Sequence, residues 1–152
     1  DRFNAFKCPS CSGPLNPKGL ICLNCKETGK IDKKSITKEL NRAQKLFEKC
    51  QKLFDLQKYS ECIKKLETCL AIRRKYLFRY HQEIAEALDL FGKVSATIGK
   101  LLESISYLEE SLETIEAIFG SDSSELAYEL NKITDVCIEY LQKEMNRRSV
   151  VY

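Results

Sequence analysis

The chain is 152 residues long, 43% hydrophobic and 31% charged, with a formal net charge of +3. This length predicts one domain with a small accessory module, and the composition excludes a disordered or collagen-like chain. No apolar run approaches the roughly 20 residues that span a bilayer, and residues 1–8 lack the apolar segment of a signal peptide. We therefore expect no membrane partner and a cytoplasmic or nuclear location. Because the sequence begins without Met, we also expect a piece of a longer protein.

The N-terminal segment contains two Cys-x-x-Cys pairs, formed by Cys8, Cys11, Cys22 and Cys25. This spacing is typical of a zinc ribbon or knuckle pair, because each turn points two sulfurs the same way and two facing turns form a tetrahedron. We expect one Zn²⁺ per chain within residues 1–30. Four thiolates leave no open coordination position, so the predicted metal is structural. It would stabilise a segment that is too short to bury a core.

Two other roles for these cysteines fit the sequence less well. Disulfides require an oxidising compartment, which nothing in the sequence indicates. A thioredoxin-like redox site requires one Cys-x-x-Cys at the start of a helix within a βαβ unit, whereas turn-forming residues surround both pairs here. Gly13 and Pro14 are expected to turn the chain away from the first pair, and Leu20–Ile21 to form a short strand leading into the second.

From about residue 35 onward, Gly and Pro almost vanish and apolar residues recur at helical spacing. A shift of 42 residues aligns this part of the chain with itself, so that small residues match small ones and most large apolar residues match large ones. The aligned sets are Ala43, Ala85 and Ala127; Leu46, Leu88 and Leu130; Leu56, Ile98 and Tyr140; Cys62 and Ser104; and Leu66 and Leu108. Such a repeat predicts stacked helices, since each unit buries its core only against its neighbours.

The predicted fold class is therefore mainly α, with antiparallel helix pairs of 42-residue period after a small Cys₄ zinc ribbon. A basic linker at 31–35 precedes the helical array at 36–146, and residues 147–152 form a tail. Within the array we expect helices at 36–56, 59–78, 81–98, 101–119 and 124–146, with Gly120 ending the fourth. The fifth lacks a partner in the sequence. We expect an incomplete third repeat with an open apolar face, which a further helix of a longer chain would cover.

The other cysteines and the single histidine receive structural interpretations. Free cysteine packs as a small hydrophobic residue, and we expect this of the four cysteines in the helices, Cys50, Cys62, Cys69 and Cys137. His81 lies between two repeats and is expected to be structural. No Ser-His-Asp set, P-loop or dinucleotide glycine motif is present. No catalytic or cofactor-binding residue is therefore assigned.

Two charged clusters in the helical part are expected to be solvated surface. The acidic cluster has the spacing of an amphipathic helix, and it comprises Glu109, Glu110, Glu113 and Glu116. The basic cluster comprises Arg73, Arg74, Lys75 and Arg79. Nucleic-acid binding has little support, because the lysines near the ribbon have no aromatic residues between them to stack on bases. These are Lys18, Lys26, Lys30, Lys33 and Lys34.

The stretch IGKLLESISYLEESLETIEAIFGSDSSELAYELNKI (98–133) resembles a long-helix form of the tetratricopeptide repeat (TPR), with Ser104 and Ser111 at small-residue positions. TPR domains that grip a C-terminal carboxylate use Lys and Asn side chains on their first helices. The matching positions here hold Phe47, Gln51 and Leu90, which cannot supply the charge-assisted hydrogen bonds of that clamp. We therefore expect no binding of acidic chaperone tails.

The order of the segments AFKCPSC, ICLNC, AQKLF and GSDSSELAYELNKI resembles the C-terminal region of the SET- and MYND-domain family of protein-lysine methyltransferases, in particular of a TPR-bearing form. The resemblance implies that a parent chain uses S-adenosylmethionine to methylate protein lysines. The SET core, post-SET and MYND motifs are absent from these 152 residues. The implied function is a non-catalytic region that binds partner or substrate protein through its helices. The alternative is a stand-alone zinc-and-TPR adaptor without enzyme activity.

Overall fold

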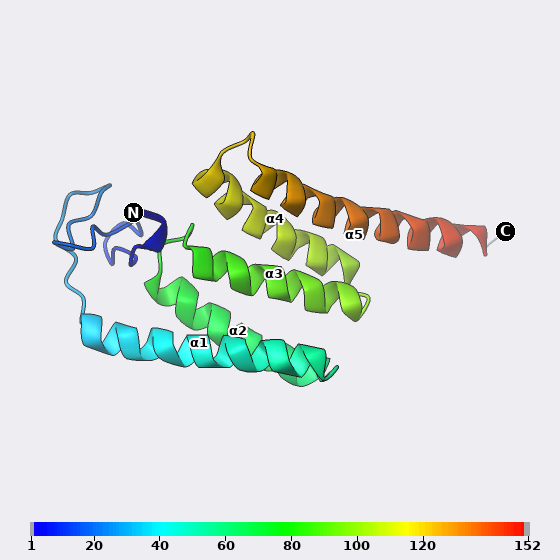
Figure 1. Ribbon diagram of the computed structural model, residues 1–152, viewed down its shortest axis with the longest axis horizontal. Helices are drawn as coiled ribbons and strands as arrows, with labels where there is room; N and C mark the ends of the chain where they lie inside the picture. The colour runs from blue at the N-terminus through cyan, green and yellow to red at the C-terminus, as the bar shows by residue number, and fades with distance from the viewer. Residues whose placement is uncertain (1, 151–152) are drawn as a thin grey trace. The chain divides into compact units, whose positions relative to one another are not determined.

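The structure is a computed structural model that describes residues 2–150, and most of these residues are helical (Figure 1). A short 3-10 helix, η1 (Arg2–Asn4), precedes the cysteine segment. Five α-helices follow: α1 (Lys33–Asp55), α2 (Tyr59–Tyr76), α3 (Gln82–Thr97), α4 (Leu101–Phe119) and α5 (Ser124–Ser149). The predicted fold, mainly α with helix pairs after a four-cysteine segment, is confirmed. None of the described helices has the length and apolar character needed to cross a membrane.

Some helix bounds differ from those expected. Helix α1 begins at Lys33 instead of residue 36, because the carboxylate of Asp32 caps it by accepting hydrogen bonds from the N–H groups of Lys34 and Ser35. Helix α2 ends at Tyr76 instead of residue 78, and α5 continues to Ser149 instead of ending at 146. The segment expected to be a linker thus contains the first turn of α1.

The connection between paired helices is the same in both repeats. Gln57, between α1 and α2, and Gly99, between α3 and α4, both adopt positive φ angles of 59° and 83°. The next residues, Lys58 and Lys100, are the N-caps of α2 and α4, and neither makes a side-chain capping bond. These equivalent positions are 42 residues apart, so the period in the sequence corresponds to a repeated local geometry.

The contact between the paired helices is repeated as well. The Cys62 thiol donates to the backbone oxygen of Cys50 at 3.3 Å, and the Ser104 hydroxyl donates to the backbone oxygen of Gly92 at 2.6 Å. A Cβ atom on Gly92 would lie 2.6 Å from a methyl carbon of Leu108. The small residues matched by the 42-residue shift therefore let the two backbones approach closely.

The chain divides into two compact units, Asp1–Ala87 and Leu88–Tyr152. In the first, α1 and α2 lie side by side and their shared core includes Ala43, Phe47 and Leu66. In the second, α4 and α5 lie side by side (Figure 1). The boundary falls inside α3, and the predicted divisions at residues 30, 35 and 146 stay predictions.

Arg73 is buried, so the expectation that it is solvated is wrong. Its side chain is 0% exposed, and its guanidinium lies 4.7 Å above the ring of Phe47. Nη1 donates to the backbone oxygen of Glu83 at 2.6 Å, and Nη2 donates to Oε1 of Gln44 at 2.8 Å. The buried charge is tolerated because α1 and the start of α3 supply these acceptors. The other members of the cluster are exposed as predicted: Arg74, Lys75 and Arg79.

His81 has the structural role expected of it. It is 6% exposed, and its Nδ1 accepts a hydrogen bond from the N–H of Glu83 at 3.1 Å, which caps the start of α3. Burial lowers the pKa of His81, the neighbouring Glu83 carboxylate raises it and the charge of Arg73 lowers it, with a net decrease. The neutral imidazole is therefore the form that the fold favours.

The cysteines of the helices are buried with one exception. Cys50, Cys62 and Cys69 are buried as predicted, and burial raises the pKa of all three, that of Cys50 to about 12. The prediction is wrong for Cys137, which is partly exposed. Among the described residues of α5, Leu126 alone is buried, because α4 covers this helix on one side and leaves its other sides uncovered.

The rest of α5 presents the open face that the sequence predicts. Its exposed large apolar residues include Leu130, Ile138, Leu141 and Met145. On α4, all four members of the acidic cluster are exposed as predicted.

Candidate metal centre

The two Cys-x-x-Cys pairs form two turns of the same geometry, 14 residues apart. The backbone oxygen of Cys8 accepts from the N–H of Ser12 at 3.0 Å, and that of Cys22 accepts from the N–H of Lys26 at 3.1 Å. Ser12 and Lys26 both have positive φ angles, 63° and 64°. Each turn therefore folds back directly after its second cysteine, and its two thiols lie on one side.

Short backbone pairings flank both turns in the same way. Lys7 pairs with Pro14, and Ile21 pairs with Thr28, each as an isolated antiparallel bridge. The expected strand at Leu20–Ile21 is not formed, since Leu20 adopts a positive φ of 55°. The segment thus consists of turns stabilised by single bridges within its described residues.

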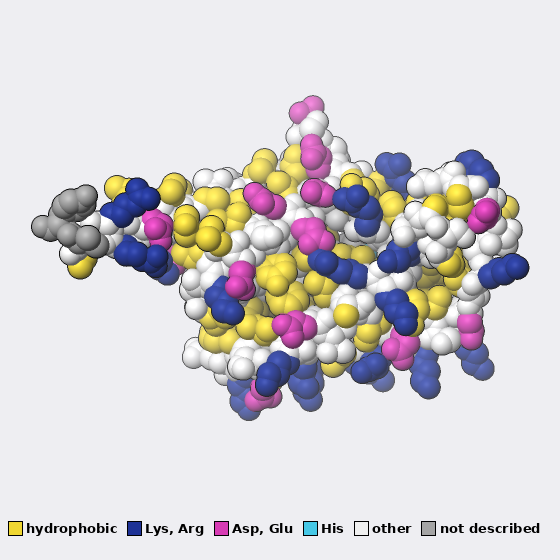
Figure 2. All heavy atoms as spheres, turned by 180° about the vertical axis from the view of Figure 1, so that it is seen from behind, with side chains coloured by type: hydrophobic (Ala, Val, Ile, Leu, Met, Phe, Trp, Pro, Cys, Tyr) yellow, Lys and Arg dark blue, Asp and Glu magenta, His cyan; other side chains and the backbone are white. Residues whose placement is uncertain are grey.

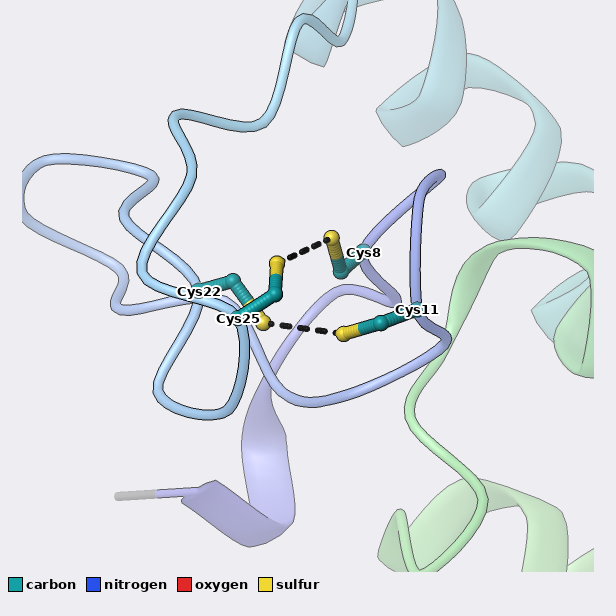
Figure 3. Close-up of side chains that lie close together, drawn as sticks. All are labelled: Cys8, Cys11, Cys22 and Cys25. Carbon is teal, nitrogen blue, oxygen red and sulfur yellow. Dashed lines mark hydrogen bonds between the residues drawn. The ribbon is translucent and has the colours of Figure 1, made fainter.

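The two turns face each other, and all four thiols point into the space between them (Figure 3). The Sγ atoms of Cys8 and Cys25 are 3.8 Å apart, those of Cys11 and Cys22 are 3.4 Å apart, and all four lie within 4.8 Å of one another. A regular tetrahedron with a metal–sulfur distance of about 2.3 Å has sulfurs about 3.8 Å apart. The four thiols predicted from the sequence are therefore brought together at distances that suit a tetrahedral metal ion.

The segment around the thiols has a very small apolar core. Cys8, Leu15 and Cys22 are buried, whereas Cys11 is exposed and Cys25 is intermediate. The partly buried residues packed against this core include Phe6 and Ile31. A core of this size cannot offset the chain entropy of an ordered segment. A bound metal would supply the missing stability.

The protonation of the thiols depends on their close approach. Burial raises the pKa of Cys22, but hydrogen bonds from the N–H groups of Cys25 and Asn24, together with those from the neighbouring cysteine side chains, outweigh it and lower the pKa to about 6. At Cys25 the N–H of Glu27 favours the thiolate, yet burial and the neighbouring cysteine side chains raise the pKa to about 12. Four thiolates at these distances repel one another, so a divalent cation is the natural counter-charge for the fully ionised set.

The cysteine segment is attached to the connection between α2 and α3. The N–H of Lys7 bonds to the backbone oxygen of Tyr76 at 2.8 Å, and the N–H of Phe78 bonds to that of Ala5 at 3.0 Å. Nζ of Lys7 also donates to the backbone oxygen of Arg74 at 2.7 Å. A metal that holds the two turns would therefore also support the end of α2.

Backbone N–H groups complete the site, as expected of Cys-x-x-Cys turns, but the sequence did not show which N–H group bonds to which thiol. The N–H of Asn24 donates to Sγ of Cys22 at 3.4 Å. The 14-residue repetition of Cys-x-x-Cys followed by one turn residue, Ser12 or Lys26, was the available signal, because it predicts two turns of equal geometry.

The class of protein is defined by a segment of four clustered thiols, which could hold a metal ion, followed by antiparallel helical repeats. No protein-family model matches the chain. The chain is similar to the protein-lysine N-methyltransferase SMYD4 of Mus musculus, with 26% identity over 136 residues that cover 89% of this chain. The human protein of that name is 24% identical over 138 residues, again 89% of this chain. That of Gallus gallus is 29% identical over 106 residues, 70% of this chain.

The chain spans 17% of the mouse and human relatives and 14% of the chicken relative. These similarities confirm the resemblance to the C-terminal region of a SET- and MYND-type protein-lysine methyltransferase that was predicted from the sequence.

Proposed function

We propose that this chain is a non-catalytic zinc-ribbon and TPR region of a SET/MYND-type protein-lysine methyltransferase, which binds a partner or substrate protein through its helices. The observation that carries the proposal is the convergence of four thiols within 4.8 Å, directly before a helical repeat. Similarity over 89% of the chain to protein-lysine N-methyltransferases supports it. S-adenosylmethionine chemistry would belong to other parts of the parent chain.

The metal in this proposal is one structural Zn²⁺, held by Cys8, Cys11, Cys22 and Cys25. Thiolates suit Zn²⁺, and four protein ligands leave no position for water or substrate. The ion would neutralise the thiolates and hold the two turns together. Through the hydrogen bonds from Lys7 and to Ala5, it would also order the connection between α2 and α3.

The helical array is the protein-binding part of the proposal, and a TPR-type array offers extended surfaces for this purpose. The clamp for C-terminal carboxylates is not expected, and the burial of Phe47 and Leu90 supports this because neither side chain can contact a peptide. Reduced thiols suit the cytoplasm or nucleus, which we propose as the location.

Native mass spectrometry tests the metal part of the proposal. We expect one zinc per chain, and Cys22→Ser should abolish binding while most helical signal remains. Cys69→Ser, a buried cysteine outside the cluster, is the matched control and should retain the metal. A metal-free wild-type protein, or disulfides among the four cysteines, would contradict the proposal.

Two further observations test the link to a methyltransferase. The chain alone should transfer no methyl group from S-adenosylmethionine to histones, and transfer above the protein-free blank would refute the non-catalytic role. The open reading frame of the parent transcript separates the two candidate functions. A SET core motif in the same frame supports the proposed region, whereas a frame without one supports the stand-alone adaptor.

A further inference from the structure

Six basic side chains form one continuous row on α1, which is called the α1 basic face below. They are spaced three or four residues apart and are all exposed: Lys34, Lys38, Arg42, Lys45, Lys49 and Lys52. At 100° per residue these positions fall within one narrow sector of the helix. The buried residues of α1 that pack in the core, such as Ala43 and Phe47, lie on the opposite side.

The α1 basic face is long and has no acidic side chain within it. It extends over about 27 Å at a rise of 1.5 Å per residue. Figure 2 shows a row of Lys and Arg side chains along the lower edge of the molecule, where α1 lies in Figure 1. All of these side chains except Lys52, together with Thr37, Asn41 and Leu46, line a shallow surface hollow of about 660 Å³.

The charges of this face are almost entirely unneutralised. Arg42 pairs with Glu39 at 3.3 Å. The five lysines of the face form no ion pair with any acidic group in the described part of the chain. Like charges at this spacing destabilise a helix, and the first turn of α1 contains basic residues but no acidic ones, which its dipole disfavours. A row of like charges that lowers the stability of its own helix points to a functional use.

The charge is also strongly divided along the chain. The first compact unit carries nineteen Lys or Arg against ten Asp or Glu, a net charge of +9, whereas the second carries six against twelve, a net charge of −6. The overall value of +3 conceals this division. A negatively charged partner would therefore be attracted to the first unit.

We propose that the α1 basic face binds an acidic protein segment in an extended conformation. Lysines four residues apart on a helix are about 6 Å apart along its axis, and alternate side chains of an extended peptide are about 6.7 Å apart. A segment of nine residues with a carboxylate at every second position carries five carboxylates over about 27 Å, which is the length of the face, so each carboxylate can meet a cation of the row. The proposal rests on the proposed function only in that the partner is a protein.

A protein segment fits this face better than a nucleic acid. No aromatic side chain lies among the residues of the face or of its hollow, so bases would have nothing to stack on. The acidic second unit would also reduce the affinity of the chain for a long polyanion.

Fluorescence anisotropy with a labelled peptide of about ten residues that alternates Glu and Ser tests the proposal. We expect saturable binding at low ionic strength that weakens with added salt. The triple variant Lys38→Gln, Lys45→Gln, Lys49→Gln should bind at least about tenfold more weakly, and Gln preserves helix propensity. The control triple Lys30→Gln, Lys64→Gln, Arg148→Gln removes the same charge from exposed positions elsewhere and should stay within about twofold of wild type.

Three results would overturn the proposal. The first is no binding of the peptide by the wild-type protein at low ionic strength. The second is equal weakening by the two triple variants, which would show that net charge alone attracts the peptide. The third is tighter binding of a single-stranded oligonucleotide of equal charge, lost in the same face variant, which would assign the face to nucleic acid. Zinc content and methyl transfer are measured separately, so failure here is distinct from failure of the proposed function.

Discussion

Replacing Arg73 tests whether its buried guanidinium stabilises the first helix pair. The side chain is 0% exposed and donates hydrogen bonds of 2.6 and 2.8 Å to Glu83 and Gln44. Hydrogen bonds from a charged donor contribute about 1.5–3 kcal/mol each, and the desolvated contact with the Phe47 ring contributes about 2 kcal/mol. Burial of the charge costs several kcal/mol and offsets part of this. The smaller alanine side chain would also leave a cavity where the arginine packs. We therefore expect Arg73→Ala to lower the free energy of unfolding by about 3–4 kcal/mol.

The variant Arg73→Met separates the packing of the side chain from its charge. Methionine retains much of the apolar stem, and it removes the cost of burying a cation. The Gln44 amide is on an exposed residue and can turn to water. We therefore expect Arg73→Met to cost only about 1 kcal/mol.

Urea unfolding followed by far-UV circular dichroism measures these differences. Lys64→Ala, on an exposed turn of the same helix, is the control and should lie within about 0.5 kcal/mol of wild type. An Arg73→Ala variant as stable as this control would show that the buried guanidinium contributes nothing. An Arg73→Met variant as unstable as Arg73→Ala would show that the charge, and not the packing, carries the effect, contrary to the estimate.

Three further predictions follow from the helices. Burial lowers the pKa of His81 below its usual value of 6.5, so the contribution of the neutral imidazole to stability is complete above pH 6.5 and is lost as the pH falls below that value. The difference in unfolding free energy between wild type and His81→Asn, measured by urea titration, should therefore shrink between pH 7.5 and pH 5. A difference that does not change with pH would contradict this prediction. Gly92→Ala gains about 1 kcal/mol of helix propensity but forces a Cβ to 2.6 Å from Leu108. We expect thermal melts to show a net loss of stability of about 1 kcal/mol, whereas a stabilised variant would show that the two helices can separate freely. The open face of α5 should make the chain self-associate, which sedimentation velocity would detect. Leu141→Gln should reduce the self-association, whereas the control Leu102→Gln on α4 should not. A monomeric wild-type protein would refute the prediction.

The sequence by itself determined the local elements and the candidate metal centre. Two Cys-x-x-Cys pairs at this spacing require two turns, and two turns can bring four sulfurs to one point. The 42-residue period located both helix pairs, and the matched small residues Cys62 and Ser104 identified where their backbones approach. The spacing of the α1 basic face was also present in the sequence, because residues three or four apart on a helix share one side.

Only the tertiary structure decided which charged and small residues are buried. A guanidinium is excluded from a core unless acceptors surround it, and those of Arg73 come from Gln44 and Glu83, on two other helices. Its neighbour Arg74, one residue away, is exposed. Cys137 has the same apolar character as Cys69 but is partly exposed, because α5 is covered by α4 on one side. Periodicity specifies the direction in which a side chain leaves its helix, whereas burial depends on what other segments place there.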